Sequence, residues 1–93
     1  MLDKVREALR ITHKKLDSEL QDVIDACKMD LTIAGITKTD EEDPLIQQAI
    51  KTYCKAEYEQ DMNKANRLTQ AYVSLKISMS LCGDYTGESE NDG

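Results

Sequence analysis

The chain has 93 residues, enough for one small domain, and its 18 acidic and 12 basic residues give a formal net charge of −6. This balance argues against a protein that grips a nucleic-acid backbone, which needs lysines and arginines to displace counterions. With no Trp and no Phe, the core must be built from Leu, Ile, Val, Ala and Met. The charged start MLDKVREALRI is unlike a signal peptide, and no apolar run approaches the roughly 20 residues of a membrane span.

The first two predicted helices carry apolar residues at three- and four-residue spacing. A short helix begins near Leu2 and ends near Ile11, and a polar joint, THKKLDS, follows it. The second helix is expected to begin at a cap formed by Asp17 or Ser18. It is expected to end at Gly35, because glycine takes the left-handed conformation without cost. The buried stripe of the second helix is predicted to be Leu16, Leu20, Val23, Ile24, Cys27 and Leu31.

Four consecutive carboxylates, residues 40–43, precede the only proline. A calcium loop beginning at Asp40 would place Pro44 and Leu45 where an oxygen ligand and a glycine are needed, so this interpretation fails. As a helix start the segment fits, because an N-cap Asp43 accepts bonds from free backbone N–H groups and Pro44 has no N–H to satisfy. A break or bend is expected around residues 60–63, with one continuous helix as the alternative. The buried stripe of this third helix is predicted to be Ile46, Ala49, Ile50, Tyr53 and Cys54.

The fourth predicted helix is apolar on two sides. A heptad-like seam runs along one side through Ala65, Leu68, Tyr72, Leu75, Met79 and Cys82. A second stripe, Val73, Ile77 and Leu81, recurs every four residues on nearly the opposite side, and we call it the outer stripe. A surface helix of a lone domain needs only one apolar stripe. The outer stripe therefore predicts either a central helix or a contact with a neighbouring subunit.

The two ends of the chain differ in charge. The first fifteen residues are basic and the remainder is acidic, and opposite charges on one subunit suit head-to-tail association. The helical domain is expected to span residues 1–82, with Gly83 stopping the last helix before a flexible acidic tail, residues 83–93. This tail is either inert or folds onto a partner, in which case Tyr85 is its expected anchor. The predicted subunit-interface residues are the outer stripe together with Arg6, Arg10, Asp40, Glu41 and Glu42.

Candidates for catalysis or metal binding are few. The cysteines Cys27, Cys54 and Cys82 lie far apart with no CxxC motif, and we interpret them as reduced and buried. The single histidine, His13, lies in the polar joint, where a solvent-exposed side chain is expected. The glycines are too dispersed for a phosphate-binding loop. The sequence therefore predicts no enzyme, no catalytic residue, no metal site and no cofactor.

In their order and spacing these segments resemble the small head–tail connector (adaptor or head-completion) proteins of tailed bacteriophages and prophages. The resemblance spans residues 1–82 and is carried by LDSELQDVIDACKMDLTIAGI, DPLIQQAIKTYCKAEYE and a last helix ending in SLKISMSL. It implies an all-α, compact bundle of about four helices that assembles into a ring of about a dozen copies.

The resemblance also implies the location and partners of such a ring. The ring would dock on the portal protein, extend the DNA channel toward the tail and present a surface to the next head-completion or tail protein. DNA would pass through it without specific binding. The subunit would have no cofactor and no membrane contact. It would belong to the virion at the head–tail junction, after a period in the cytoplasm of the bacterial host.

Two other functions fit parts of the sequence. An acidic helical regulator or DNA mimic that sequesters a basic protein partner would use the net charge and the acidic run at residues 40–43. A nucleic-acid binder with a basic arm would use Arg6, Arg10, Lys14 and Lys15. Recovery of virion proteins in a pull-down favours the connector, whereas recovery of nucleases or repressors favours the regulator.

Overall fold

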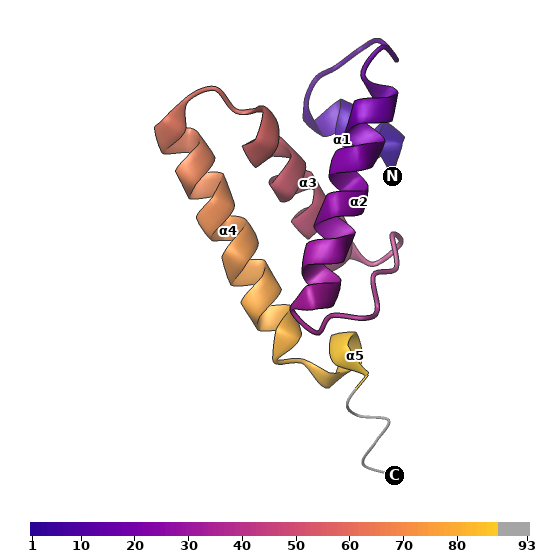
Figure 1. Ribbon diagram of the computed structural model, residues 1–93, viewed down its shortest axis with the longest axis vertical. Helices are drawn as coiled ribbons and strands as arrows, with labels where there is room; N and C mark the ends of the chain where they lie inside the picture. Colours follow the sequence, from indigo (N-terminus) through magenta and orange to yellow (C-terminus); the bar gives the residue numbers. More distant parts are fainter. Residues whose placement is uncertain (88–93) are drawn as a thin grey trace.

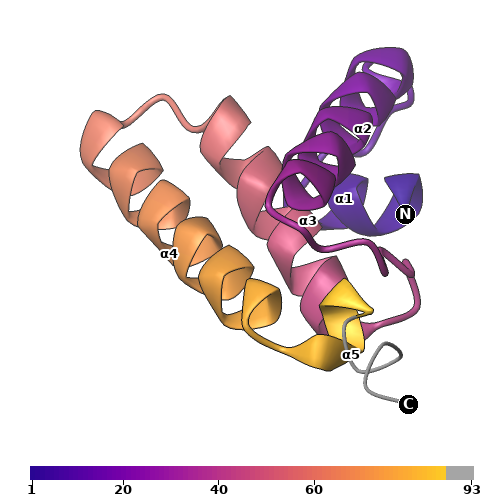
Figure 2. The ribbon, with the colours of Figure 1, turned by 60° about the horizontal axis from the view of Figure 1, so that its bottom comes forward.

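The computed structural model describes residues 1–87, over which the chain forms five helices and no strand. These are α1 (Leu2–Ala8), α2 (Asp17–Ile33), α3 (Pro44–Tyr58), α4 (Met62–Ser80) and the short α5 (Gly83–Thr86). Helix α3 lies in the middle, with α4 on one side and α1 and α2 on the other (Figure 1, Figure 2). The predicted all-α bundle is confirmed.

The hydrophobic core lies where α2 and α3 meet, and α1 and α4 close it from either side. Burial of each large aliphatic side chain contributes about 1.5–3 kcal/mol to stability. The predicted stripes of α2 and α3 are confirmed, with Leu16, Val23 and Tyr53 at their partly buried margins. The buried core residues are Val5, Leu20, Ile24, Cys27, Leu31, Ile36, Ile46, Ala49, Ile50, Cys54, Tyr72 and Met79.

The predicted signals at the end of α2 and the start of α3 are also confirmed. Gly35 has a φ of +93°, the left-handed conformation expected just after a helix. The side chain of Asp43 accepts hydrogen bonds from the backbone N–H groups of Leu45 and Ile46 at 2.8 and 3.3 Å. Pro44 occupies the first turn. The carboxylate before the proline therefore starts α3.

The connection between α3 and α4 lies at the predicted break. Helix α3 ends at Tyr58, and its C-cap residue Glu59 is extended. Asp61 then caps α4, accepting hydrogen bonds from the backbone N–H groups of Asn63 and Lys64 at 2.9 and 3.2 Å. The chain thus reverses within three residues, and α4 packs back along α3.

The predicted cap of α2 was wrong. Leu16 occupies the N-cap position, and neither Asp17 nor Ser18 makes a side-chain cap hydrogen bond. The carboxylate of Asp17 instead accepts a hydrogen bond from Nε of Arg6 at 2.8 Å. This ion pair joins α1 to the first turn of α2. Because the carboxylate of Asp17 binds Arg6, it does not cap the helix.

Helix α1 ends at Ala8, short of the predicted end near Ile11. The reason is Arg10, which takes a left-handed conformation with a φ of +59°. The N–H of Ile11 then donates to the carbonyl of Arg6 at 2.9 Å, which closes the helix in the manner that usually requires glycine. A residue with a Cβ pays about 1–2 kcal/mol for this conformation.

The last helices also differ from expectation. Gly83 does not stop α4, which ends at Ser80 with Leu81 as its C-cap residue. Gly83 instead begins α5, so helical structure continues past the expected boundary at residue 82. The predicted flexible tail from residue 88 onward lies outside the described residues. No helix in the described part of the chain is long and apolar enough to cross a membrane.

Candidate assembly surface

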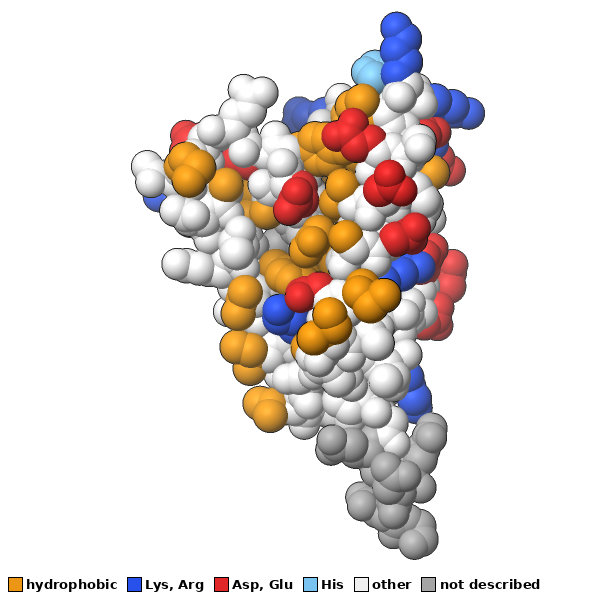
Figure 3. Space-filling view, in the orientation of Figure 1, with side chains coloured by type: hydrophobic (Ala, Val, Ile, Leu, Met, Phe, Trp, Pro, Cys, Tyr) orange, Lys and Arg blue, Asp and Glu red, His pale blue; other side chains and the backbone are white. Residues whose placement is uncertain are grey.

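The outer stripe lies on the solvent side of α4. Val73, Ile77 and Leu81 are 36%, 52% and 83% exposed, whereas Tyr72 and Met79 on the other side are buried against the core. Single exposed apolar residues are common on proteins, but a row at four-residue spacing makes a continuous patch. Figure 3 shows this row as orange side chains along the lower part of α4. The predicted two-sided character of α4 is confirmed, and the contact of its outer side with a neighbour stays a prediction.

A groove of about 230 Å³ lies beside the outer stripe, and we call it the front groove. Val73 lines it from α4, Tyr53 and Glu57 line it from α3, and Asp30 lines it from α2. Because Val73 belongs to both the groove and the stripe, the two surfaces are continuous. The front groove therefore extends the apolar patch toward α2.

A polar network crosses the base of the front groove. Oδ2 of Asp30 accepts hydrogen bonds from the hydroxyl of Tyr72 at 2.6 Å and from Nζ of Lys76 at 3.0 Å. The hydrogen bond from Tyr72 lowers the pKa of Asp30, with a further contribution from Lys76. Burial, followed by the bond to Asp30, raises the pKa of Tyr72. The network joins α2 to α4 and keeps Asp30 occupied within the subunit.

The rim of the front groove is acidic. Figure 3 shows acidic side chains along α2 and over α3 on this side of the molecule. Glu57 lines the groove from α3. Glu19 and Asp22 lie further along α2, at roughly 20° and 80° from Asp30 around the helix axis. All three are exposed and form no ion pair with another described residue, and Glu19 interacts with the hydroxyl of Tyr58. We call the front groove with these three acids the front face. The charges of Asp22 and Glu57 are available to a partner.

A second charged surface lies on α3 between α1 and α4. Three adjoining depressions of about 420, 350 and 360 Å³ open there, and Lys55 lines all three. None of the basic residues around them forms an ion pair with another described residue. We call this surface the basic face, and its cations are Lys4, Arg10, Lys51, Lys55, Lys64 and Arg67.

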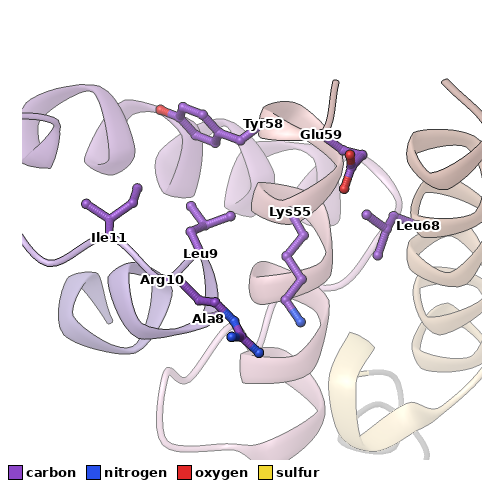
Figure 4. Close-up of a pocket in the computed structure, with 8 residues that line it drawn as sticks. All are labelled: Ala8, Leu9, Arg10, Ile11, Lys55, Tyr58, Glu59 and Leu68. Carbon is purple, nitrogen blue, oxygen red and sulfur yellow. The ribbon is translucent and has the colours of Figure 1, made fainter. Parts of the chain in front are cut away.

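The first depression has an apolar base beneath its cations. Figure 4 shows Leu9 and Tyr58 at this base, Leu68 approaching from α4, and Arg10 and Lys55 at its edge. Burial raises the pKa of Tyr58 to about 12, so its hydroxyl stays protonated at neutral pH. The basic face therefore combines apolar area with several cations, and Glu59 is the one acid that lines this first depression.

The basic face and the acids of the front face were not predicted from the sequence. At roughly 100° per residue, Lys51 and Lys55 share one side of α3, and Glu57 lies on nearly the opposite side. This spacing was the one feature of the sequence that could have indicated two oppositely charged faces on α3. It carries no meaning until the neighbours of α3 are known, because the run KAEYE otherwise looks like mixed charge near a helix end.

Two of the charges predicted to join subunits are paired within the chain. Arg6 binds Asp3 and Asp17, and Glu41 binds Nζ of Lys28 and lies 3.5 Å from the amino group of Met1. The bond from Lys28 lowers the pKa of Glu41. A paired charge offers less to a neighbour. The acidic run that a DNA mimic would use is therefore partly neutralised.

The remaining predicted interface charges, Arg10, Asp40 and Glu42, are exposed. Arg10 lies on the basic face, whereas Asp40 accepts a hydrogen bond from the backbone N–H of Glu42 at 3.0 Å. Tyr85, the predicted anchor of the tail on a partner, has its hydroxyl next to Asp43 of the same chain. The structure thus separates Arg10 from the acidic run and engages Tyr85 internally.

The described residues offer few groups for metal binding or nucleophilic attack. No group of three or more His, Cys, Asp or Glu side chains among residues 1–87 could hold a metal ion. Burial raises the pKa of the Cys27 thiol to about 12 and that of Cys54 to about 11, so both are poor nucleophiles at neutral pH. His13 is exposed, as predicted.

These surfaces define a class of small helical proteins with exposed apolar and charged faces. The particular family follows from comparison with known families: the chain belongs to the phage connector proteins, which it matches over residues 1–86. Neither a curated protein nor a solved structure matches it. The resemblance inferred from the sequence is confirmed at this level, which makes the protein a structural component of a phage particle that assembles with other head and tail proteins.

Proposed function

We propose that this protein is the subunit of a ring at the head–tail junction that docks on the portal and extends the DNA channel toward the tail. Membership of the connector family supports the role in the particle. The outer stripe supports the ring, because it is apolar, exposed and located on one side of α4. A contact between this side and a different surface of the next copy is heterologous, and heterologous contacts close into rings when their rotation allows it.

The observation that carries the proposal is the exposure of Ile77 in the middle of the outer stripe. Ile77→Asp places a carboxylate where the next subunit would exclude water, and burial of an unpaired charge is costly. The variant is expected to fold as the native chain does, with a change below about 0.5 kcal/mol, because the position is exposed. It is expected to lose the ring that forms with the portal of the same phage, as seen by electron microscopy and light scattering.

Met62→Asp is the matched control for this experiment. It makes the same kind of change on the same helix, at a position that is 73% exposed and about 22 Å from Ile77 along α4. This variant is expected to form rings normally. Rings formed by Ile77→Asp would contradict the role of the outer stripe, and a native chain that binds neither itself nor the portal would contradict the proposed function.

The proposed partners are further copies of the chain, the portal protein, and the next head-completion or tail protein. DNA would pass through the ring without specific binding, because the net charge of −6 opposes tight contact with phosphates. The ring would contain about a dozen copies. It would assemble either in solution or only after the subunits bind the portal. The protein would reach the particle from the cytoplasm of the infected host.

A further inference from the structure

We propose that the front face of one subunit binds the basic face of the next copy of this chain. The inference rests on the proposed ring and specifies which two surfaces of the subunit meet. The acids around Glu57 would contact the cations around Lys55. The apolar side chains of the front groove and outer stripe would cover the apolar base beneath those cations.

The two faces are displayed on nearly opposite sides of one helix. Lys55 and Glu57 both lie on α3, two residues and therefore roughly 200° apart. The front groove opens between α2 and α4, whereas the basic face lies between α1 and α4. Opposite location is what a head-to-tail contact needs, because each copy uses one face toward each neighbour.

The faces also match in composition. The front groove combines Val73 and Tyr53 with the acid Glu57, which is unpaired among the described residues, and its Lys76 is paired with Asp30. The basic face combines Leu9 and Leu68 with its six cations, which are likewise unpaired and outnumber the acids Glu7 and Glu59 in the same depressions. An apolar centre with a charged rim is the usual anatomy of a protein–protein contact. Complementary rim charges fix which partner binds and in which orientation.

Charge complementarity favours a second copy over nucleic acid. A phosphate backbone would suit the basic face alone and would be repelled by the rest of a chain with a charge of −6. A copy of the same chain satisfies both faces at once. It also explains why six cations without ion pairs among the described residues gather on one side of an acidic protein.

The test uses two double variants with opposite charge changes. The basic-face variant is Lys55→Glu with Arg67→Glu, and the front-face variant is Asp22→Lys with Glu57→Lys. Each double variant alone would place like charges across every contact between subunits, and we expect its self-association to fall at least tenfold. Sedimentation at low salt measures self-association, and electron microscopy detects portal-bound rings.

Restoration is the decisive measurement. In an equimolar mixture of the two double variants, every contact of an alternating ring again pairs opposite charges, so assembly is expected to return. A chain that carries all four changes is expected to assemble with itself. The matched control, Lys14→Glu with Lys15→Glu, makes the same charge change in the exposed joint and is expected to assemble normally. Helical circular dichroism checks that each variant folds.

Several outcomes would overturn the inference. Rings formed by each double variant alone would overturn the pairing of the two faces and would leave the connector role intact. The connector role itself is refuted only if the native chain does not bind the portal. Loss of assembly in both variants without recovery on mixing would also count against it. Binding of a short DNA duplex that is lost in the basic-face variant, with self-association unchanged, would assign the basic face to nucleic acid instead.

Discussion

The hydroxyl oxygen of Tyr85 lies 3.0 Å from each carboxylate oxygen of Asp43, the residue that caps α3. The carbonyl of Tyr85 also accepts hydrogen bonds from the backbone N–H groups of Thr37 and Lys38 at 3.0 and 3.1 Å. Helix α5 is therefore fastened to both ends of the loop between α2 and α3. The last described turn of the chain holds the start of the central helix in place.

Removal of this hydroxyl should loosen α5. Tyr85→Phe is expected to lower the free energy of unfolding by about 1 kcal/mol, the typical net value of a hydrogen bond. It should also speed hydrogen exchange of the Thr37 and Lys38 amides, because α5 protects them. Urea denaturation and exchange measured by NMR check both effects. Asp84→Asn, a change at an exposed position of the same helix, is the control, and equal exchange in both variants would refute the fastening.

The carboxylate of Asp30 should make stability depend on acid pH. Its pKa lies below its ordinary value of about 3.9, chiefly because of the hydrogen bond from Tyr72. The unfolded chain therefore takes up this proton first as the pH falls. The stabilisation is complete above the ordinary pKa and is lost as the pH falls through the folded-state value.

Asp30→Asn tests this dependence. The variant is expected to have a free energy of unfolding about 1 kcal/mol below that of the native chain near pH 6. We keep this value small because the Asp30 side chain is 37% exposed and solvent screens its charge. Near pH 2 the two proteins should differ less. Denaturant titrations between these pH values measure the difference. Asp22→Asn on the same helix is the control, and a constant difference at every pH would speak against the mechanism.

The three cysteines should differ in reactivity. Cys27 and Cys54 are fully buried, and burial raises their pKa values to about 12 and about 11. Cys82 is only partly buried, near the end of α4. A thiol reagent at pH 7.5 should therefore modify Cys82 first and the other two only after denaturation. Mass spectrometry of the modified protein gives the sites, and early modification of Cys27 would contradict the described packing.

The strained backbone of Arg10 should be relieved by glycine. Arg10→Gly is expected to stabilise the chain by about 0.5–1 kcal/mol, because glycine adopts the positive φ of this position without a steric cost. Thermal or urea unfolding measures the gain. Lys14→Gly, at an exposed position without positive φ, is the control and should not stabilise. A loss of stability in Arg10→Gly would show that the side chain makes contacts worth more than the strain.

Local signals predicted most of the fold. The stripes of α2 and α3 follow from apolar spacing, and the cap formed by Asp43 follows from the residues on either side of it, so no distant contact was needed. The cap of α2 could not be predicted in this way. The carboxylate of Asp17 could either cap α2 or pair with a cation. It pairs with Arg6, which only the packing of α1 brings within reach.

The same distinction holds for the assembly surface. The outer stripe was visible in the sequence because Ile77 and its neighbours recur along one helix. The pairing of Glu41 with Lys28 was not, since it depends on where the loop before α3 lies against α2. Lys55 and Glu57 form separate surfaces only because α1, α2 and α4 pack around α3 and leave its two charged sides uncovered.

If subunits join front to back as proposed, the two oppositely charged sides of α3 also bear on how growth of the ring would stop. An arc of subunits joined front to back always ends in one bare positive pole and one bare negative pole, whatever its length. Bending the arc until its ends touch cancels both poles in a single step, so the circle is electrostatically favoured over the open string. A ring built in this way would need no separate capping factor, and the direction of its charged sides would give it a one-way order.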